Sequence, residues 1–386
     1  MAYNTTIFNQ MVLFISRLDF RHLVNKHNGD FRIRTLRCWD QFIHLLLAQL
    51  IKRSSLRDTI FSAHTLQNKL YHLGSRIVKR STLSDANNKR PYQIYQDLFY
   101  KVLEQTQKIA PKHKLKINRK IFFLDATTID LCLSLFPWAR FRKTKAAVRL
   151  HTLLQADGAL PVFMNITDGK VHESQIALSI PIPSGSYLAV DRGYHDFSQY
   201  NVYNNSNIRF VTRMKTNARY RVLETKISDP SAPVRSDQII EFTGYATYKK
   251  CPRLFRKIEY YSKEQDKILV FLSNDFENSA ETIADIYKAR WDIELFFKTI
   301  KQNLKIKRFF GTSANAVFTQ VWIAMITYLM ISFFKFLHKS KYSVQTIFRI
   351  IQVNIFERKD LKELLTNKFT KPPGSVNEMQ ICLFKF

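Results

Sequence analysis

Glycine and cysteine are scarce in this chain of 386 residues, which has nine glycines and four cysteines. The sequence has neither the GxGxxG fingerprint of a dinucleotide-binding turn nor the GxxxxGK[ST] loop of a nucleotide hydrolase. Neither nucleotide hydrolysis nor dinucleotide chemistry is therefore expected. The cysteines are isolated from one another, which excludes a disulfide framework and a CxxC metal site. We therefore expect a reducing, cytoplasmic environment.

Long apolar runs are also missing, because the most apolar stretch, Val321–Phe334, is shorter than the roughly 20 residues that span a bilayer. It is predicted to be a buried helix, and a membrane span is the less favoured alternative. The first 20 residues have no basic region ahead of their short apolar run, so a signal peptide is not expected. The sequence therefore predicts no membrane partner.

Acidic residues are few, with 31 Asp and Glu against 60 Lys and Arg, and the formal net charge is +29. The basic residues are spread through both halves of the chain and do not form one tail. A distributed surplus of this size favours a polyanionic partner such as DNA. The alternative is a basic surface that serves only solubility.

The hydrophobic pattern divides the chain into three parts. Up to residue 112, apolar residues recur at helical spacing between basic turns, and this unit could place a helix in a DNA groove or could simply be a bundle with solvated charge. From residue 113 short β-rich runs follow one another, and helical spacing returns at Ala280. A mixed α/β protein preceded by an all-α N-terminal domain is expected.

Two aspartates stand where apolar runs end, Asp125 after IFFL and Asp191 after YLAV. Each would lie where a buried strand emerges, although a lone aspartate there often only caps a turn. A third carboxylate, Glu294, shares a predicted helix face with four other polar residues, Tyr287, Arg290, Lys298 and Lys301. An ordinary surface ladder would explain the glutamate and the lysines, but it would not require the tyrosine and the arginine.

If the three carboxylates converge, each ionised pair at about 5 Å repels by roughly 3 kcal/mol at an effective dielectric constant near 20. A divalent cation would remove this repulsion, and oxygen ligands suit Mg²⁺ or Mn²⁺. Two such ions can activate water and stabilise the leaving oxygen of a phosphodiester. Tyr287, Arg290, Lys298 and Lys301 would then bind the DNA backbone near the bond that is cut.

The pattern Y-x2-R-x3-E-x6-K is matched by Tyr287, Arg290, Glu294 and Lys301. Together with LDATTID around Asp125 and AVDRGY around Asp191, it resembles the signature of the insertion-sequence-four family of DDE transposases. The resemblance implies a ribonuclease-H-like catalytic fold in which Asp125, Asp191 and Glu294 bind the metal. It also implies a β-rich insertion between the second aspartate and the glutamate, and a dimer that brings two DNA ends together.

From the pattern and the resemblance we expect four parts in the chain. They are a helical DNA-binding domain (1–112), a split catalytic domain (113–215 and 281–338), a β-rich insertion (216–280), and a C-terminal helix and tail (339–386).

The resemblance further implies that a DNA hairpin forms during cleavage. Trp291 could stack on a flipped base in that step, or it could pack in the core on Phe297. Arg213 and Lys215 alternate on one predicted strand, where phosphate binding and plain solvation are equally expected.

The predicted function is that of a bacterial DNA transposase associated with the nucleoid. It would cut at the terminal inverted repeats of its element and join the 3′-hydroxyl ends to target DNA, by metal-dependent hydrolysis and transesterification. Two alternatives stay open. One is an inactive DNA-binding repressor of transposition, and the other is a metal-dependent nuclease that never joins strands.

Overall fold

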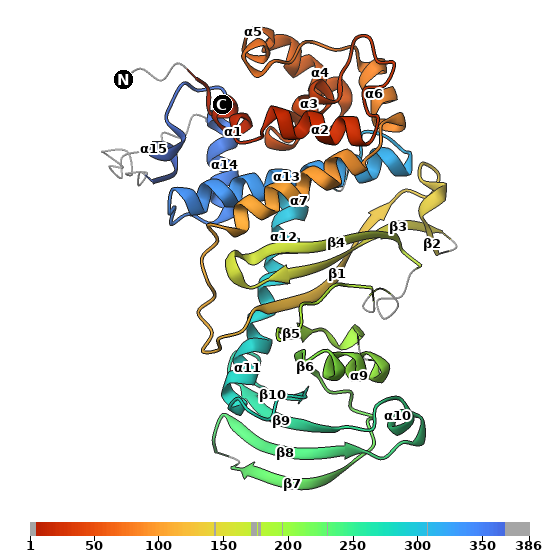
Figure 1. Ribbon diagram of the computed structural model, residues 1–386, viewed down its shortest axis with the longest axis vertical. Helices are drawn as coiled ribbons and strands as arrows, with labels where there is room; N and C mark the ends of the chain where they lie inside the picture. Colours follow the sequence, from red (N-terminus) through yellow and green to blue (C-terminus); the bar gives the residue numbers. More distant parts are fainter. Residues whose placement is uncertain are drawn as a thin grey trace, which may run out of the picture.

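Helices form one end of the molecule, and a single twisted sheet extends from them to the other end (Figure 1). The computed structural model describes residues 5–142, 144–170, 176, 179–194, 196–229, 231–306 and 308–366. The N-terminal helices are α1 (Ile7–Leu13), α2 (Arg17–Lys26), α3 (Cys38–Leu50), α4 (Leu56–Thr65), α5 (Gln67–Leu70), α6 (Arg80–Lys89) and α7 (Gln93–Gln107). An all-α N-terminal region is therefore present, as predicted.

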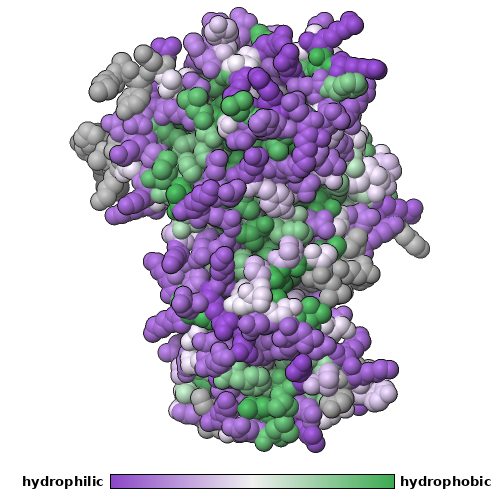
Figure 2. Space-filling view, in the orientation of Figure 1, coloured by the Kyte–Doolittle hydropathy of each residue, from purple (hydrophilic) through white to green (hydrophobic). Residues whose placement is uncertain are grey.

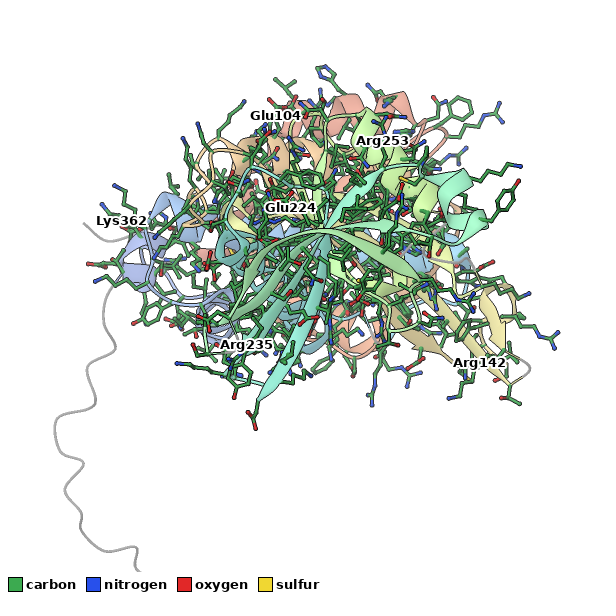
Figure 3. All side chains as sticks on the ribbon, turned by 90° about the horizontal axis from the view of Figure 1, so that it is seen from below. Glu104, Arg142, Glu224, Arg235, Arg253 and Lys362 are labelled. Atoms are coloured by element: carbon green, nitrogen blue, oxygen red, sulfur yellow. The ribbon has the colours of Figure 1, made fainter. Side chains whose placement is uncertain are left out.

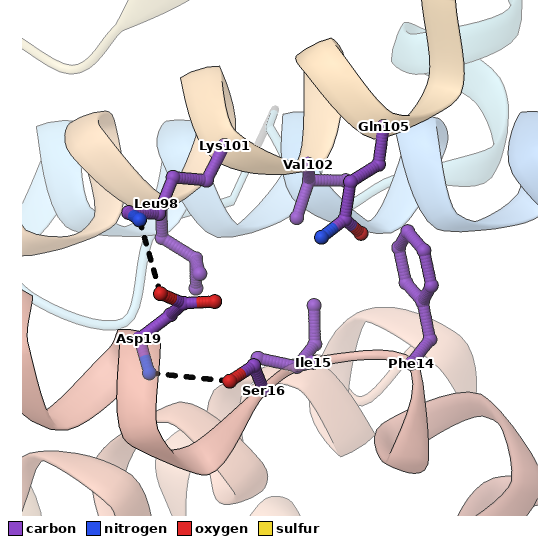
Figure 4. Close-up of a pocket in the computed structure, with 8 residues that line it drawn as sticks. All are labelled: Phe14, Ile15, Ser16, Asp19, Leu98, Lys101, Val102 and Gln105. Carbon is purple, nitrogen blue, oxygen red and sulfur yellow. Dashed lines mark hydrogen bonds and ion pairs between the residues drawn. The ribbon is translucent and has the colours of Figure 1, made fainter. Parts of the chain in front are cut away.

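The corner between α1 and α2 shows how these helices begin and pack. Ser16 follows the first apolar run and caps α2, because its hydroxyl accepts a hydrogen bond from the Asp19 amide. Asp19 also forms an ion pair with Lys101 of α7 at 3.1 Å, as Figure 4 shows. The pocket enclosed there has a volume of only about 10 Å³, so it holds nothing larger than a water molecule.

The sheet contains ten strands in one continuous hydrogen-bonded array. They are β1 (Ile121–Leu131), β2 (Arg140–Arg142), β3 (Lys145–Gln155), β4 (Leu160–Asp168), β5 (Tyr187–Val190), β6 (Arg209–Arg213), β7 (Tyr220–Ser228), β8 (Val234–Phe242), β9 (Leu254–Ser262) and β10 (Lys267–Ser273). The order is β2-β3-β1-β5-β6-β10-β9-β8-β7, and β4 also pairs with β3. Among the strand pairs of the described residues, β1–β5 and β5–β6 are parallel and the others are antiparallel.

The β1 strand is buried on both faces. Ile121 and Phe123 belong to the core shared with the helices, whereas Phe122 and Leu124 belong to the core on the opposite face, which contains α9 (Phe197–Asn205). Burial on both faces explains why the sequence has the unbroken apolar run IFFL and no alternation there.

The strands predicted as a separate insertion extend this same sheet. The chain leaves at β6, forms β7, β8 and β9, and returns as β10 beside β6. Hydrophilic residues cover most of the face seen in Figure 2, and apolar residues gather at the end formed by β7 and β8, where Val222 and Leu223 are exposed. The predicted boundaries at 215 and 280 stay a prediction, because the sheet itself has no break there.

The remaining helices are α10 (Tyr245–Lys250), α11 (Ala280–Ala289), α12 (Trp291–Asn303), α13 (Ala314–Leu337), α14 (Val344–Asn354) and α15 (Leu361–Thr366). By length and composition α13 could cross a membrane, yet 89% of its most apolar segment is buried inside the protein. It packs against α7 and α3. The prediction of a buried helix is confirmed, and α13 lies within the helical end rather than on the sheet.

Two long helices end in the same strained way. Lys52 follows α3 with φ of 54°, and Lys339 follows α13 with φ of 49°, so both lie in the left-handed region that favours glycine. A side chain there costs about 1 kcal/mol relative to glycine. In each case the next amide closes the turn, from Arg53 to the Ala48 carbonyl and from Ser340 to the Lys335 carbonyl.

Charged side chains project from the molecule in all directions. Seen from below, Arg142 of β2, Arg235 of β8, Arg253 before β9 and Lys362 of α15 lie at widely separated points (Figure 3). The positive charge is therefore spread over the surface as the sequence predicts.

Candidate active site

Asp125 and Asp191 lie side by side where two parallel strands adjoin. Leu124 of β1 is the register partner of Val190 of β5, so the next residue of each strand is one of the two aspartates. Neighbouring strands are about 4.8 Å apart. The Ala126 amide donates to Asp125 Oδ1 at 2.7 Å, and the Gly193 amide donates to Asp191 Oδ2 at 3.3 Å, which fixes both carboxylates.

Glu294, the third carboxylate, lies on α12, which packs against β1. Its apolar face is the one predicted from the sequence, because Ile293, Phe297 and Ile300 are all buried. Glu294, beside that face, keeps 36% of its side chain exposed. The glutamate is thereby held near β1 with its carboxylate accessible.

Arg290 joins two of the three carboxylates directly. Its Nη1 lies 3.4 Å from Asp125 Oδ2, and its Nη2 donates to Glu294 Oε1 at 2.7 Å. Burial lowers the pKa of Arg290, but the negative charges of Asp125, Asp191 and Glu294 raise it, and the net pKa is above its ordinary value. Asp125 and Glu294 thus contact one guanidinium group, and Asp191 is near enough for its charge to act on that group.

The helix that carries this motif is interrupted, which corrects the prediction of one continuous face. Tyr287 is in α11, which ends at Ala289, and Glu294 is in α12, which begins at Trp291. Arg290 lies between them but keeps helical angles of φ −55° and ψ −23°. Because Arg290 stays helical, the motif keeps its helical spacing, and Arg290 contacts both Tyr287 and Glu294.

The start of α11 is anchored by a buried ion pair. Arg256 of β9 and Asp237 of β8 form two parallel hydrogen bonds of 2.8 and 2.7 Å, and their side chains are only 6% and 2% exposed. Arg256 also donates to the carbonyls of Asp275 and Asn278, in the loop before α11. This loop positions the helix pair that carries Tyr287, Arg290 and Glu294.

Tyr287 and Arg213 lie beside the carboxylates. The centre of the Tyr287 ring lies 4.8 Å from that of Phe271. The Arg290 guanidinium carbon lies over the Tyr287 ring, 5.5 Å from its centre, in a cation–π contact. Burial raises the pKa of Tyr287, Asp191 raises it too, and the positive charges of Arg290 and Arg213 lower it. Arg213 is thus close enough to act on the site, whereas Lys215, beyond the end of β6, is exposed.

Trp291 is exposed over 58% of its surface, so the alternative that it packs in the core is wrong. It lines an open pocket of about 830 Å³ between the β9–β10 hairpin and the α11–α12 junction. Tyr287, Arg290 and the half-buried Asp292 line the same pocket. Burial raises the pKa of Asp292, a residue that sequence reasoning missed although it directly follows Trp291.

The two lysines of the motif continue along α12 away from the carboxylates. Lys298 is exposed and Lys301 is partly buried. Two other aspartates follow the proposed ligands by five residues and have other positions, because Asp130 is exposed on β1 and Asp196 caps α9.

The side chains at this site are of the types that bind divalent cations. Within the described ranges no three acidic, histidine or cysteine side chains are placed to hold a metal ion. Arg290 lies among the three carboxylates instead, and these four groups leave two negative charges in excess. An excess of negative charge favours divalent cations, and carboxylate oxygens are the ligands that Mg²⁺ and Mn²⁺ prefer.

Two curated proteins are similar in sequence to this chain. A probable transposase for insertion sequence element IS5377 of Geobacillus stearothermophilus is 28% identical over 254 residues, 65% of this chain and 66% of its own length. A predicted transposase of Sinorhizobium fredii is 29% identical over 282 residues, 72% of this chain and 78% of its own length.

One solved structure, a piggyBac transposase synaptic complex with hairpin DNA, matches with a TM-score of 0.44 and 10% identity, over 91% of this chain and 78% of its own. Residues 3–76 match a domain of unknown function, DUF4372. Residues 117–330 match the transposase DDE domain. Since that match covers more than half of the chain, the chain belongs to the DDE transposase family, whose members cut DNA and transfer strands.

Proposed function

We propose that this transposase cuts DNA at the terminal inverted repeats of its insertion element and joins the 3′-hydroxyl ends to target DNA, with Asp125, Asp191 and Glu294 as metal ligands. The observation that carries the proposal is the position of the Arg290 guanidinium. It forms ion pairs with Asp125 and Glu294, and the charge of Asp191 raises its pKa. DDE transposases use divalent metal ions. The proposal here is specifically two Mg²⁺ ions, with Mn²⁺ as a substitute.

The residues of the chain have separate roles in this proposal. The three carboxylates hold the metal, which when bound supplies an activated water and a stabilised leaving oxygen. Arg290 and Tyr287 orient the phosphate at the cut, since a guanidinium presents a planar fork that matches phosphate oxygens. Lys298 and Lys301 follow along α12 and bind the backbone beyond it, while Arg213 and Lys215 approach from β6.

We further propose a ribonuclease-H-like catalytic fold and membership of the insertion-sequence-four subgroup. The parallel β1, β5 and β6, flanked by antiparallel β3 and β4, support the fold. The match of Tyr287, Arg290, Glu294 and Lys301 to Y-x2-R-x3-E-x6-K supports the subgroup.

The N-terminal helices would recognise the repeat, and a homodimer would pair two ends in a synaptic complex in the bacterial cytoplasm, at the nucleoid. No membrane partner is part of the proposal. Light scattering of the protein with paired end DNA would give the number of chains in the complex.

One assay separates the transposase from its two alternatives. The protein is incubated with labelled DNA that carries the element's ends, a target plasmid, and Mg²⁺, Mn²⁺ or a chelator. Cutting followed by joining, lost with the chelator, is the expected result. Cutting without joining would identify a nuclease, and binding without cutting would identify a repressor.

We expect Trp291→Ala to lower the yield of hairpin ends about tenfold and to leave the first nick unchanged. Stacking on a base is worth about 1–3 kcal/mol, and 1.4 kcal/mol is a factor of ten. Denaturing gels of end-labelled DNA would resolve nicks from hairpins. The matched control is Leu295→Ala, one turn further along α12 and 44% exposed, which should change neither product. If the wild-type enzyme yields nicks and never hairpins, the stacking role is refuted.

A further inference from the structure

A second basic site lies where two distant parts of the chain meet. A pocket of about 200 Å³ is bounded by the turn after α3, by the end of α12 and by the loop that follows it. Four cations line it, Lys52, Lys301, Lys305 and Arg308, together with the amides of Gln302 and Asn303. None of the described lining residues is acidic. Only Lys301 belongs to the motif that the sequence reveals.

Lys52 is held in this pocket close to other positive charges. Its Nζ lies 3.5 Å from Asn303 Oδ1 and 5.5 Å from the centre of the Phe348 ring. Burial lowers the pKa of Lys52, and the charges of Arg349 in α14 and Lys305 lower it further. These cations repel one another, so an anion bound among them would relieve an unfavourable arrangement.

The backbone at Lys52 adds an independent observation. The residue after α3 has φ of 54°, where glycine is the favoured residue, and the chain places a lysine there. The side chain of Lys52 extends from this turn to Asn303 Oδ1, at the edge of the pocket. The turn therefore places a positive charge beside the end of α12, whereas Lys339, at the same kind of turn after α13, does not line the pocket.

We infer that this pocket binds a backbone phosphate of the element's DNA, at a distance from the bond that is cut. Glu294 and Asn303 are nine residues apart on α12, which corresponds to about 14 Å at 1.5 Å per residue. At about 3.4 Å per nucleotide along one strand, the phosphate would lie roughly four nucleotides from the cleaved bond. This position rests on the proposed catalytic role of Glu294, whereas the binding itself does not.

Such a contact would link two regions that the sequence separates. Lys52 comes from the N-terminal helices, and Lys305 and Arg308 come from the segment after the catalytic helix. One phosphate bound by both regions would fix where the N-terminal helices lie on the DNA relative to the three carboxylates. The binding would be independent of base sequence.

The test is Lys52→Gly, compared with Lys339→Gly. Both variants remove one lysine from the same left-handed position after a helix, so they change charge and backbone strain equally, but Lys339 does not line the pocket. Binding to a fluorescent end-containing duplex is measured without divalent metal over a range of salt concentrations. We expect Lys52→Gly to weaken binding about eightfold near 0.1 M salt and to reduce the salt slope by about 0.9.

Lys339→Gly should bind as the wild type does, and both variants should melt no lower than the wild type. Equal affinity and equal slope for the two variants would overturn the inference. Since no cleavage is required, this result is independent of whether the carboxylates are catalytic, and the cleavage assay tests those separately.

Neutral methylphosphonates placed singly along the duplex locate the contact. A methylphosphonate placed about four nucleotides from the cut should weaken DNA binding by the wild type and leave binding by Lys52→Gly unchanged. The same loss of affinity in both proteins would contradict the assignment.

Inorganic phosphate distinguishes a DNA contact from a site for small anions. If it raises the melting temperature of the wild type but not of Lys52→Gly, and DNA affinity is the same for both, the pocket is a small-anion site and the DNA contact is refuted.

Discussion

Asp125→Asn is expected to reduce DNA cleavage and joining at least about a thousandfold without loss of DNA binding. The substitution keeps the shape of the side chain but removes the charge that faces Arg290 and, in the proposed mechanism, a metal ligand. Loss of a metal ligand forfeits several kcal/mol of transition-state stabilisation, and about 4 kcal/mol corresponds to a thousandfold change in rate. Single-turnover cleavage of end-containing DNA measures the rate, and a gel shift measures binding.

The control for this prediction is on the same strand. Asp130→Asn makes the same chemical change five residues later, at an exposed position, and should leave cleavage within about twofold of the wild type. Glu294→Gln should behave like Asp125→Asn, and Glu281→Gln, in the exposed first turn of α11, like the control. Wild-type cleavage by Asp125→Asn would remove the basis for the proposed metal site.

Asp237→Leu is expected to lower the free energy of unfolding by about 3–5 kcal/mol. It would leave Arg256 buried without its carboxylate partner, and breaking a buried ion pair from one side typically has an effect of this size. Burial lowers the pKa of Arg256, whereas Asp237 raises it above its ordinary value in the wild type. In the variant the guanidinium still keeps its charge, because arginine does not lose its proton in proteins. Urea denaturation followed by circular dichroism gives the free energy.

The comparison is an exposed pair on the same sheet. Glu241→Gln breaks the Arg221–Glu241 contact of 2.6 Å between β7 and β8, where the arginine is 65% exposed, and the expected change is below about 1 kcal/mol. Replacing Asp237 and Arg256 together by leucine should recover part of the loss, because no charge is then left buried. A change below 1 kcal/mol for Asp237→Leu alone would show that the pair does not anchor the loop before α11.

The strands that lead to Asp125 and Asp191 were predictable because their sequence signal is local. IFFL and YLAV are short apolar runs that each end in an aspartate, and parallel strands with matched register place those aspartates together. The helix signal at Glu294 was also local, since the buried face of α12 follows from helical spacing. These three positions, together with the family resemblance, were sufficient to place the candidate site.

Interactions between distant segments could not be predicted in the same way. Arg290 was assigned to DNA alone, because nothing near it in the sequence shows that Asp125, 165 residues away, faces its guanidinium. The exposure of Trp291 was left open, because the sequence does not show which segments pack beside the junction of α11 and α12. No sequence pattern marks Lys52, since its pocket forms only when the turn after α3 meets the end of α12 and the loop that follows it.

The place of α13 has a consequence for how the protein is made. Since α13 packs on α3 and α7, the apolar sides of these N-terminal helices stay uncovered until the ribosome has translated past residue 337. A copy cut short by a stop codon before α13 would expose those surfaces and aggregate or be degraded. Truncated copies of the element therefore would not yield a stable N-terminal fragment that competes for the DNA ends, and only a chain translated nearly to its end would occupy them.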